Sequence, residues 1–249
     1  MRYREFGAEN SETILLLHGG GLSWWNFREE AALLEGDYRV ILPILDGHAG
    51  SDRPFTTIED NAAEILAFID EELGGSVALI GGLSLGAQVL LELLSRRAEL
   101  CACAMVESVA AIPDRLTHAL IRPAFGSSYG LIRDRSFARL QARSLHIREE
   151  LFEDYYRDTC QIRKEDMIAF LRASTAYAPK ESLRDARAEI HVYFGQRETG
   201  QIRRSAERLR QLRPDCVLHP LPGLYHGGFS LDRAEDYARE ARRLLGGAR

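Results

Sequence analysis

The five residues Gly82-Leu83-Ser84-Leu85-Gly86 place one serine in a tight turn between two glycines. An apolar run over residues 77–80 precedes this turn, and a stretch with helical character over residues 87–94 follows it. A serine hydroxyl attacks a carbonyl when it stands clear of the backbone, and a sharp strand-to-helix turn exposes it in this way. The N–H groups at the start of the helix then point at developing negative charge. The pattern predicts that Ser84 is a nucleophile and that the N–H of Leu85 stabilises an oxyanion.

A serine hydroxyl is a weak nucleophile at neutral pH, so a base must lie within hydrogen-bond distance of it. Of the seven histidines, His226 follows a Pro-Gly turn after the last expected strand, at the sheet edge where Ser84 should emerge. We expect the other six to be packed in strands, held in loops or placed in a helical segment: His18, His48, His118, His146, His191 and His219. We therefore predict that His226 is the base.

A carboxylate is needed to orient the imidazole and to stabilise its cation. Glu198 follows an expected strand over residues 190–194, at the same sheet edge as His226. Glu107 ends another expected strand and is the alternative. We predict that Glu198 is the orienting acid, and the sequence leaves Glu107 open.

The glycine run Gly19-Gly20-Gly21 follows an apolar strand and lets a substrate oxygen approach the backbone closely. Gly20 is the expected second donor to the oxyanion, with Gly21 as the alternative. Trp24 and Trp25 come next in the chain. We expect Gly21 and Trp24 to border the substrate pocket, the alternative being that both tryptophans lie in the core.

No pattern in the sequence indicates a cofactor or a bound metal ion. The glycine run lacks the Gly-x-Gly-x-x-Gly fingerprint of dinucleotide-binding proteins and the acidic residue that follows it. The four cysteines include no Cys-x-x-Cys pair. The sequence therefore predicts neither a zinc site nor a redox site.

Strands and helices alternate along most of the chain, which predicts a doubly wound, mostly parallel α/β sheet. Sites in such sheets form at the carboxyl ends of the strands. The expected strands cover residues 13–17, 38–43, 76–81, 100–106, 189–195 and 216–221. The expected helices cover residues 24–34, 57–73, 87–94, 201–212 and 231–245. The alternation breaks at residues 112–185, which we predict to be a helical cap inserted into a core of residues 1–111 and 186–249.

The composition is that of an ordinary globular protein, with 249 residues, 45% hydrophobic and 28% charged. A net charge of -5 without a cluster of basic residues argues against nucleic-acid binding. There is no apolar run of membrane-spanning length, and Met1–Glu5 lacks the apolar segment of a secretion signal. These features predict a cytoplasmic protein without a membrane partner, and they leave the oligomeric state open.

The sequence resembles the α/β-hydrolase superfamily over nearly its whole length. The resemblance rests on the turn around Ser84, the glycine run after His18, the Asp46–Asp52 turn, and Glu198 and His226 in the order serine, acid, histidine. One departure is that the family more often has Asp where this chain has Glu198.

The resemblance implies a serine hydrolase that cleaves a small carboxylic ester or thioester through an acyl-serine intermediate. The same residue set also serves C–C bond hydrolases, lyases, acyltransferases and amidases in related folds. The alternative from another class is a non-catalytic protein that binds a small ligand. The expected partner is a small-molecule acyl substrate that enters under the helical insertion.

Overall fold

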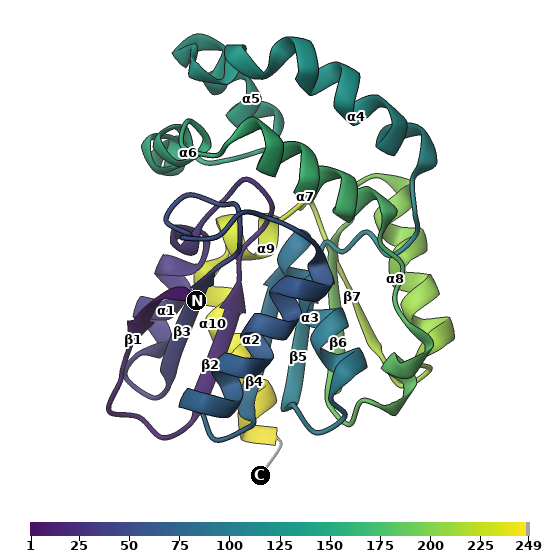
Figure 1. The fold of residues 1–249 in the computed structure, drawn as a ribbon. Helices are drawn as coiled ribbons and strands as arrows, with labels where there is room; N and C mark the ends of the chain where they lie inside the picture. Colours follow the sequence, from purple (N-terminus) through teal and green to yellow (C-terminus); the bar gives the residue numbers. More distant parts are fainter. Residues whose placement is uncertain (248–249) are drawn as a thin grey trace.

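A seven-stranded sheet runs through the computed structural model, which describes residues 1–247 (Figure 1). Its strand order is β1-β3-β2-β4-β5-β6-β7, with β1 antiparallel to β3 and every other neighbouring pair parallel. The strands are β1 (Arg2–Phe6), β2 (Thr13–Leu17), β3 (Arg39–Ile44), β4 (Val77–Leu83), β5 (Cys101–Glu107), β6 (Glu189–Gly195) and β7 (Val217–Leu221). The predicted mostly parallel α/β sheet is confirmed.

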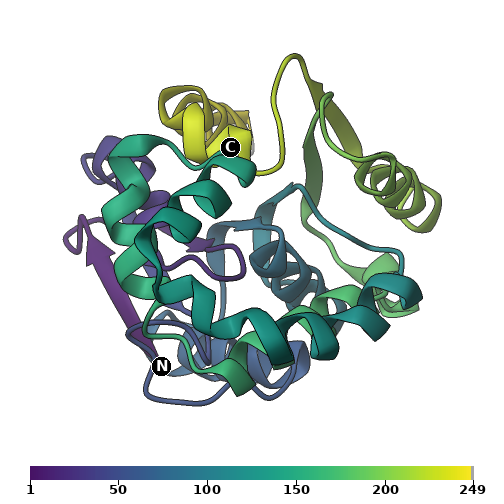
Figure 2. The ribbon, with the colours of Figure 1, turned by 90° about the horizontal axis from the view of Figure 1, so that it is seen from above.

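Helices cover both faces of this sheet (Figure 2). The first face packs against α2 (Ile58–Glu72), α3 (Leu85–Arg96) and α8 (Gly200–Leu212). The second packs against η1 (Trp24–Phe27), α1 (Arg28–Leu34), α9 (Gly228–Asp232) and α10 (Ala234–Gly247). Because both faces are covered, central strands such as β2, buried along its whole length, read as continuous apolar runs.

Two elements differ from the sequence-based expectation. β1 was not predicted, because this antiparallel edge strand leaves most of its residues exposed and has no apolar run. The single helix expected over residues 231–245 is two helices, α9 and α10, with a break at Arg233. The carboxylate of Glu107 accepts the N–H groups of Phe229 and Ser230 in the first turn of α9, which starts the shorter helix separately.

The chain between β5 and β6 forms helices that lie over the carboxyl ends of the strands (Figure 1). The structure describes all of residues 112–185 and shows no strand there. The helices are α4 (Arg115–Ser128), η2 (Tyr129–Arg133), α5 (Arg135–Ser144), η3 (Glu149–Leu151), α6 (Phe152–Thr159), α7 (Lys164–Ala176) and η4 (Glu181–Asp185). Their division from the core at 112 and 185 as a separate cap stays a prediction.

Buried polar contacts tie these helices to the sheet. The indole Nε1 of Trp25 donates to Asp158 at 2.9 Å, and the N–H of Phe55 donates to Asp166 at 2.9 Å. Both aspartates are buried, so water does not weaken these contacts. These contacts anchor α6 and α7 to the segments of the chain that carry Trp25 and Phe55.

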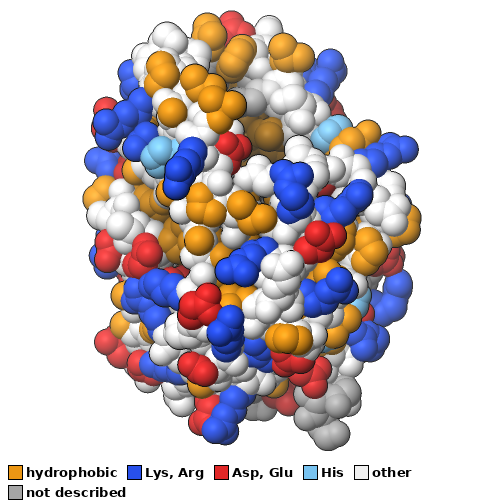
Figure 3. Space-filling model, turned by 90° about the vertical axis from the view of Figure 1, so that its right-hand side faces the viewer, with side chains coloured by type: hydrophobic (Ala, Val, Ile, Leu, Met, Phe, Trp, Pro, Cys, Tyr) orange, Lys and Arg blue, Asp and Glu red, His pale blue; other side chains and the backbone are white. Residues whose placement is uncertain are grey.

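The molecular surface carries both signs of charge. On the face shown in Figure 3, Lys and Arg side chains are interspersed with Asp and Glu, while apolar side chains gather near its upper end. Within residues 1–247 no helix has both the length and the apolar character needed to cross a bilayer.

Candidate active site

Ser84 occupies the single-residue turn between β4 and α3. Its backbone has φ 52° and ψ -107°, a conformation that costs free energy in a residue with a side chain. The turn is also very close: a Cβ on Gly82 would lie 2.6 Å from the carbonyl carbon of Gly86, and a Cβ on Gly86 would collide with the carbonyl of Leu17. Glycine is therefore required on both sides of the serine. The N–H of Ser84 donates to the carbonyl of Glu107 at 2.9 Å, which fixes the turn.

His226 and Glu198 meet at the same edge of the sheet. The Nδ1 atom of His226 lies 2.8 Å from Oε2 of Glu198. The Glu198 side chain is 2% exposed, whereas that of His226 is 47% exposed. A buried carboxylate at this distance selects the tautomer with the proton on Nδ1, so Nε2 is left as the basic nitrogen.

The second oxygen of Glu198 is also fully engaged. Oε1 accepts the hydroxyl of Ser108 and the N–H of Gly195, each at 2.8 Å. Ser108 in turn accepts the N–H of Gly227, the residue after His226, at 3.0 Å. Ser108 thus links the Glu198 carboxylate and the loop of His226 to the end of β5.

Glu107 lies apart from this group and has another task. Its Oε1 accepts the N–H groups of Phe229 at 2.9 Å and Ser230 at 3.1 Å, so it holds the start of α9 rather than an imidazole. Burial raises the pKa of Glu107 to about 7, against the lowering effect of the bonds from Ser230 and Phe229. Of the two carboxylates that the sequence left open, the one beside His226 is Glu198.

The glycine loop leaves one backbone donor free beside the serine turn. The N–H of Gly19 donates to Asn26 at 3.2 Å, and that of Gly21 donates to Nε2 of His48 at 3.0 Å. Within the described residues the N–H of Gly20 has no acceptor, and a Cβ on Gly20 would lie 3.6 Å from Cβ of Leu85. Leu85 begins α3, so its own N–H has no acceptor within the helix. The two expected donors, Gly20 and Leu85, are therefore neighbours, and Gly21 is already engaged.

Two buried neutral histidines shape this loop. The Nδ1 atom of His48 lies 3.0 Å from the carbonyl oxygen of Asp46, so Nδ1 carries the proton. Nε2 is then the acceptor for the N–H of Gly21. His18 repeats the arrangement, with Nδ1 on the carbonyl of Gly19 and Nε2 accepting the N–H of Leu45. Burial lowers the pKa of His48 to about 4, and burial together with the nearby His48 lowers the pKa of His18 to about 3. Both rings therefore stay neutral acceptors over a wide pH range.

Several of the candidate site residues line one cavity of about 200 Å³. Its wall includes Ser84, His226 and Gly20, together with the apolar side chains of Leu22, Leu83, Leu145, Ile147 and Leu231. Leu145 and Ile147 come from the loop between α5 and η3, so the helices above the sheet supply part of the wall. The arrangement can enclose a small, largely apolar group next to a serine hydroxyl.

Two predicted pocket residues do not line this cavity. Trp24 lies in a different, larger depression, where the guanidinium of Arg4 sits 5.3 Å from the centre of its ring. The Trp24 side chain in η1 lies beside Arg4 of β1 and not on this cavity, and its expected place at the substrate pocket stays a prediction. Trp25 is buried in the core. Gly21 is also absent from the wall, since its N–H points to His48.

Three residues that contribute to the site were missed: Ser108, His48 and Asn26. A signal for Ser108 was available, because a polar residue that directly follows β5 must lie near the ends of β4 and β6. His48 follows β3, next to the strand that leads into the glycine run, and could have been found in the same way. Asn26 lies in η1 and had no such signal.

Comparisons with known proteins agree with the fold. A sequence model described as the alpha/beta hydrolase family matches residues 14–240. A curated relative from Gibberella zeae, described as an AB hydrolase superfamily protein, is 33% identical over 138 residues. The match covers 51% of this chain and 45% of the relative, so it spans about half the length of that protein.

Solved structures with the same fold cover nearly the whole chain. A thermophilic esterase from Thermogutta terrifontis is 18% identical with a TM-score of 0.79, over 99% of this chain and 93% of its own. The esterase RhEst1 from Rhodococcus sp. ECU1013 is 21% identical with a TM-score of 0.77, over 99% and 94%. An enol-lactonase from Burkholderia xenovorans LB400 is 17% identical with a TM-score of 0.72, over 98% and 96%.

Proposed function

The chain belongs to the α/β hydrolase family, and from this premise we propose that it is a serine hydrolase that cleaves a small carboxylic ester or thioester through an acyl-serine intermediate. One observation carries the proposal: the 2.8 Å contact between Glu198 and Nδ1 of His226, beside a cavity that His226 and Ser84 both line. An imidazole oriented in this way offers Nε2 to a serine hydroxyl.

In the proposed reaction, Nε2 of His226 takes the proton of Ser84 as the hydroxyl oxygen attacks the substrate carbonyl. The N–H groups of Gly20 and Leu85 stabilise the oxyanion, and Glu198 stabilises the imidazolium. The protonated imidazole then gives its proton to the leaving alcohol or thiol. Water, deprotonated by His226, attacks the acyl-serine and releases the acid.

Within the described residues no hydrogen bond joins the Ser84 hydroxyl to His226, although both line the cavity. The side chain of His226 is nearly half exposed, so its ring has room to approach the serine when a substrate binds. Catalytic hydrogen bonds commonly tighten only at that stage.

The cavity supports a small apolar acyl or alcohol group as the bound part of the substrate. Its volume of about 200 Å³ suits a short chain rather than a long fatty acyl chain, and its side walls are mainly leucine and isoleucine. Esterases and a lactonase are among the solved structures of the same fold, which supports the ester class.

The proposal is tested by labelling with a fluorophosphonate probe and by turnover of p-nitrophenyl esters of increasing chain length. We expect wild-type protein to be labelled and to prefer short chains. The Ser84→Ala variant should lose labelling and at least about a thousandfold in kcat. Ser127→Ala, an exposed serine on α4, is the matched control and should behave as wild type. Labelling that persists in Ser84→Ala would refute the assignment, and no labelling or turnover by the wild type would favour a ligand-binding protein.

A further inference from the structure

Two histidines that the proposed hydrolysis does not use meet between β6 and β7. Nδ1 of His191 lies 3.0 Å from Nε2 of His219. Glu240 on α10 completes the group, since one ligand atom from each of the three residues lies within 4.8 Å of the other two. None of the three lines the cavity at Ser84.

The fold brings these side chains together on one face of the sheet. His191 and Tyr193 are two positions apart in β6, so their side chains lie on the same face of the sheet. The strand register pairs Tyr193 with His219 on β7. Tyr193 supports both partners, because its ring stacks on His219 at 4.5 Å and its hydroxyl donates to Glu240 at 2.8 Å. The group is thus held in place by packing as well as by its own contacts.

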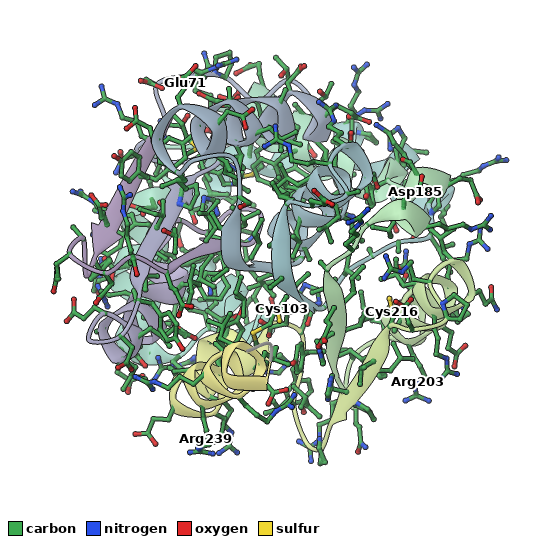
Figure 4. The ribbon with its side chains drawn as sticks, turned by 90° about the horizontal axis from the view of Figure 1, so that it is seen from below. Glu71, Cys103, Asp185, Arg203, Cys216 and Arg239 are labelled. Atoms are coloured by element: carbon green, nitrogen blue, oxygen red, sulfur yellow. The ribbon has the colours of Figure 1, made fainter. Side chains whose placement is uncertain are left out.

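Helix α10 contributes the carboxylate from the second face of the sheet. Glu240 follows the buried Tyr237 by three residues, which puts both on the side of the helix that faces the strands. In Figure 4, α10 with its labelled Arg239 lies beside the start of β5 at Cys103, and the labelled Cys216 comes directly before β7. The sulfur of Cys103 contacts the carbonyl of Leu244 at 3.9 Å, which confirms that α10 lies against this part of the sheet.

We propose that His191, His219 and Glu240 bind a divalent transition-metal ion, with zinc as the best match. Two imidazole nitrogens and one carboxylate oxygen are typical zinc ligands, and water can complete a tetrahedron. Zinc lies about 2.0–2.1 Å from each nitrogen, which places two tetrahedral ligands about 3.3 Å apart. The nitrogens of His191 and His219 are already at nearly this separation.

The other nitrogen of His191 supports the same assignment. Nε2 is buried and has no hydrogen-bond partner within the described residues, while Oε2 of Glu189 lies 3.8 Å away. With a metal ion on Nδ1, the proton resides on Nε2 and faces the carboxylate of Glu189. Histidines that bind zinc usually point their second nitrogen at such an acceptor, which orients the ring.

Arg243 is the competing cation at this site. Its Nε and Nη2 atoms donate to the two carboxylate oxygens of Glu240 at 2.7 and 2.9 Å. The Arg243 side chain is 58% exposed, so it can turn into solvent when a metal ion takes its place. Removal of the guanidinium should therefore strengthen metal binding, a result that a purely structural ion pair does not predict.

A metal ion here would join three elements that are distant in the sequence. β7 is an edge strand without a buried residue, and the loop that carries His226 follows it. Coordination would link β7 to β6 and to α10. The inference is independent of the proposed hydrolysis, because it concerns other residues and another part of the fold.

The test is a zinc titration of the full-length protein by calorimetry, after treatment with a chelator that is then removed. We expect one zinc ion per chain, an increase in Tm on binding, and visible ligand-field absorption when Co²⁺ replaces zinc. His219→Ala should weaken zinc binding at least about tenfold. Arg243→Gln should strengthen it severalfold.

His118→Ala is the matched control and should bind zinc as the wild type does, since His118 lies on α4. His191 is buried, so the partly exposed His219 is the better residue to replace, and circular dichroism checks that the variant folds. The proposal is overturned if the wild type binds no zinc, or if folded His219→Ala binds zinc as tightly as His118→Ala.

Discussion

The hydroxyl of Ser108 donates a hydrogen bond of 2.8 Å to Glu198. Ser108 directly follows β5 and has φ 52°, a backbone conformation that costs free energy in a residue with a side chain. The hydroxyl oxygen of Ser108 also accepts the N–H of Gly227, which links the Glu198 carboxylate to the loop of His226. Ser108 is therefore a positioning residue for the proposed site, although it does not line the cavity.

We expect Ser108→Ala to lower kcat about tenfold to a hundredfold, because a hydrogen bond to a charged carboxylate is lost while the rest of the site remains. The effect should fall on kcat and leave KM nearly unchanged, since Ser108 does not touch the bound substrate. Steady-state kinetics on a p-nitrophenyl ester measures both constants. A rise in KM at constant kcat would show that Ser108 acts on substrate binding instead.

Glu198→Gln should lower kcat about a hundredfold or more, because a neutral amide cannot stabilise the imidazolium. Glu107→Gln should lose distinctly less, since Glu107 holds the start of α9 and does not contact the imidazole. Both variants are compared by kcat and by Tm. The opposite ranking would transfer the orienting role to Glu107.

Stability should depend on pH through Glu107. Burial raises its pKa in the folded protein to about 7, well above the unfolded value near 4.5. The folded state then binds more protons than the unfolded state between these pH values, so the free energy of unfolding falls as pH rises from about 4.5 to 7. The loss amounts to about 3 kcal/mol. Burial also raises the pKa of Glu30, which acts in the same direction.

Denaturant unfolding at pH 5 and pH 8 measures this dependence. Glu107→Gln keeps an oxygen for the N–H groups of Phe229 and Ser230 but cannot ionise. Its loss of stability between the two pH values should therefore be smaller than that of the wild type. An equal loss in both proteins would mean that Glu107 stays ionised in the folded state across this range.

The wall of the cavity should set the chain-length preference. Ile147 is buried against the cavity, so Ile147→Ala enlarges the space and should shift the preferred ester toward longer acyl chains. Leu140→Ala is the matched control, because Leu140 is 67% exposed and lies away from the cavity. Ratios of kcat/KM along a series of p-nitrophenyl esters report the change. An unaltered preference in Ile147→Ala would place the acyl group elsewhere.

The alternation of strands and helices and the serine turn could be predicted from the sequence. Strands β2 and β6 have the predicted bounds, because strands buried on both faces must be apolar throughout. The turn at Ser84 could be predicted because Gly82 and Gly86 lie close together in the sequence and pack against each other's backbone. Strand β1 could not be predicted, because an exposed edge strand needs no apolar pattern.

The contacts between side chains of distant elements could not be predicted from the sequence. Glu107 ends β5 and Glu198 follows the neighbouring parallel strand β6, and only the contacts of each side chain distinguish their roles. Trp24 lies beside Arg4 of β1, a strand that was not predicted from the sequence. His191 and Glu240 are 49 positions apart and share no local spacing, so no motif could reveal them. Local patterns record the periodicity of an element and its turns, whereas contacts between distant elements follow from sheet order, register and helix packing.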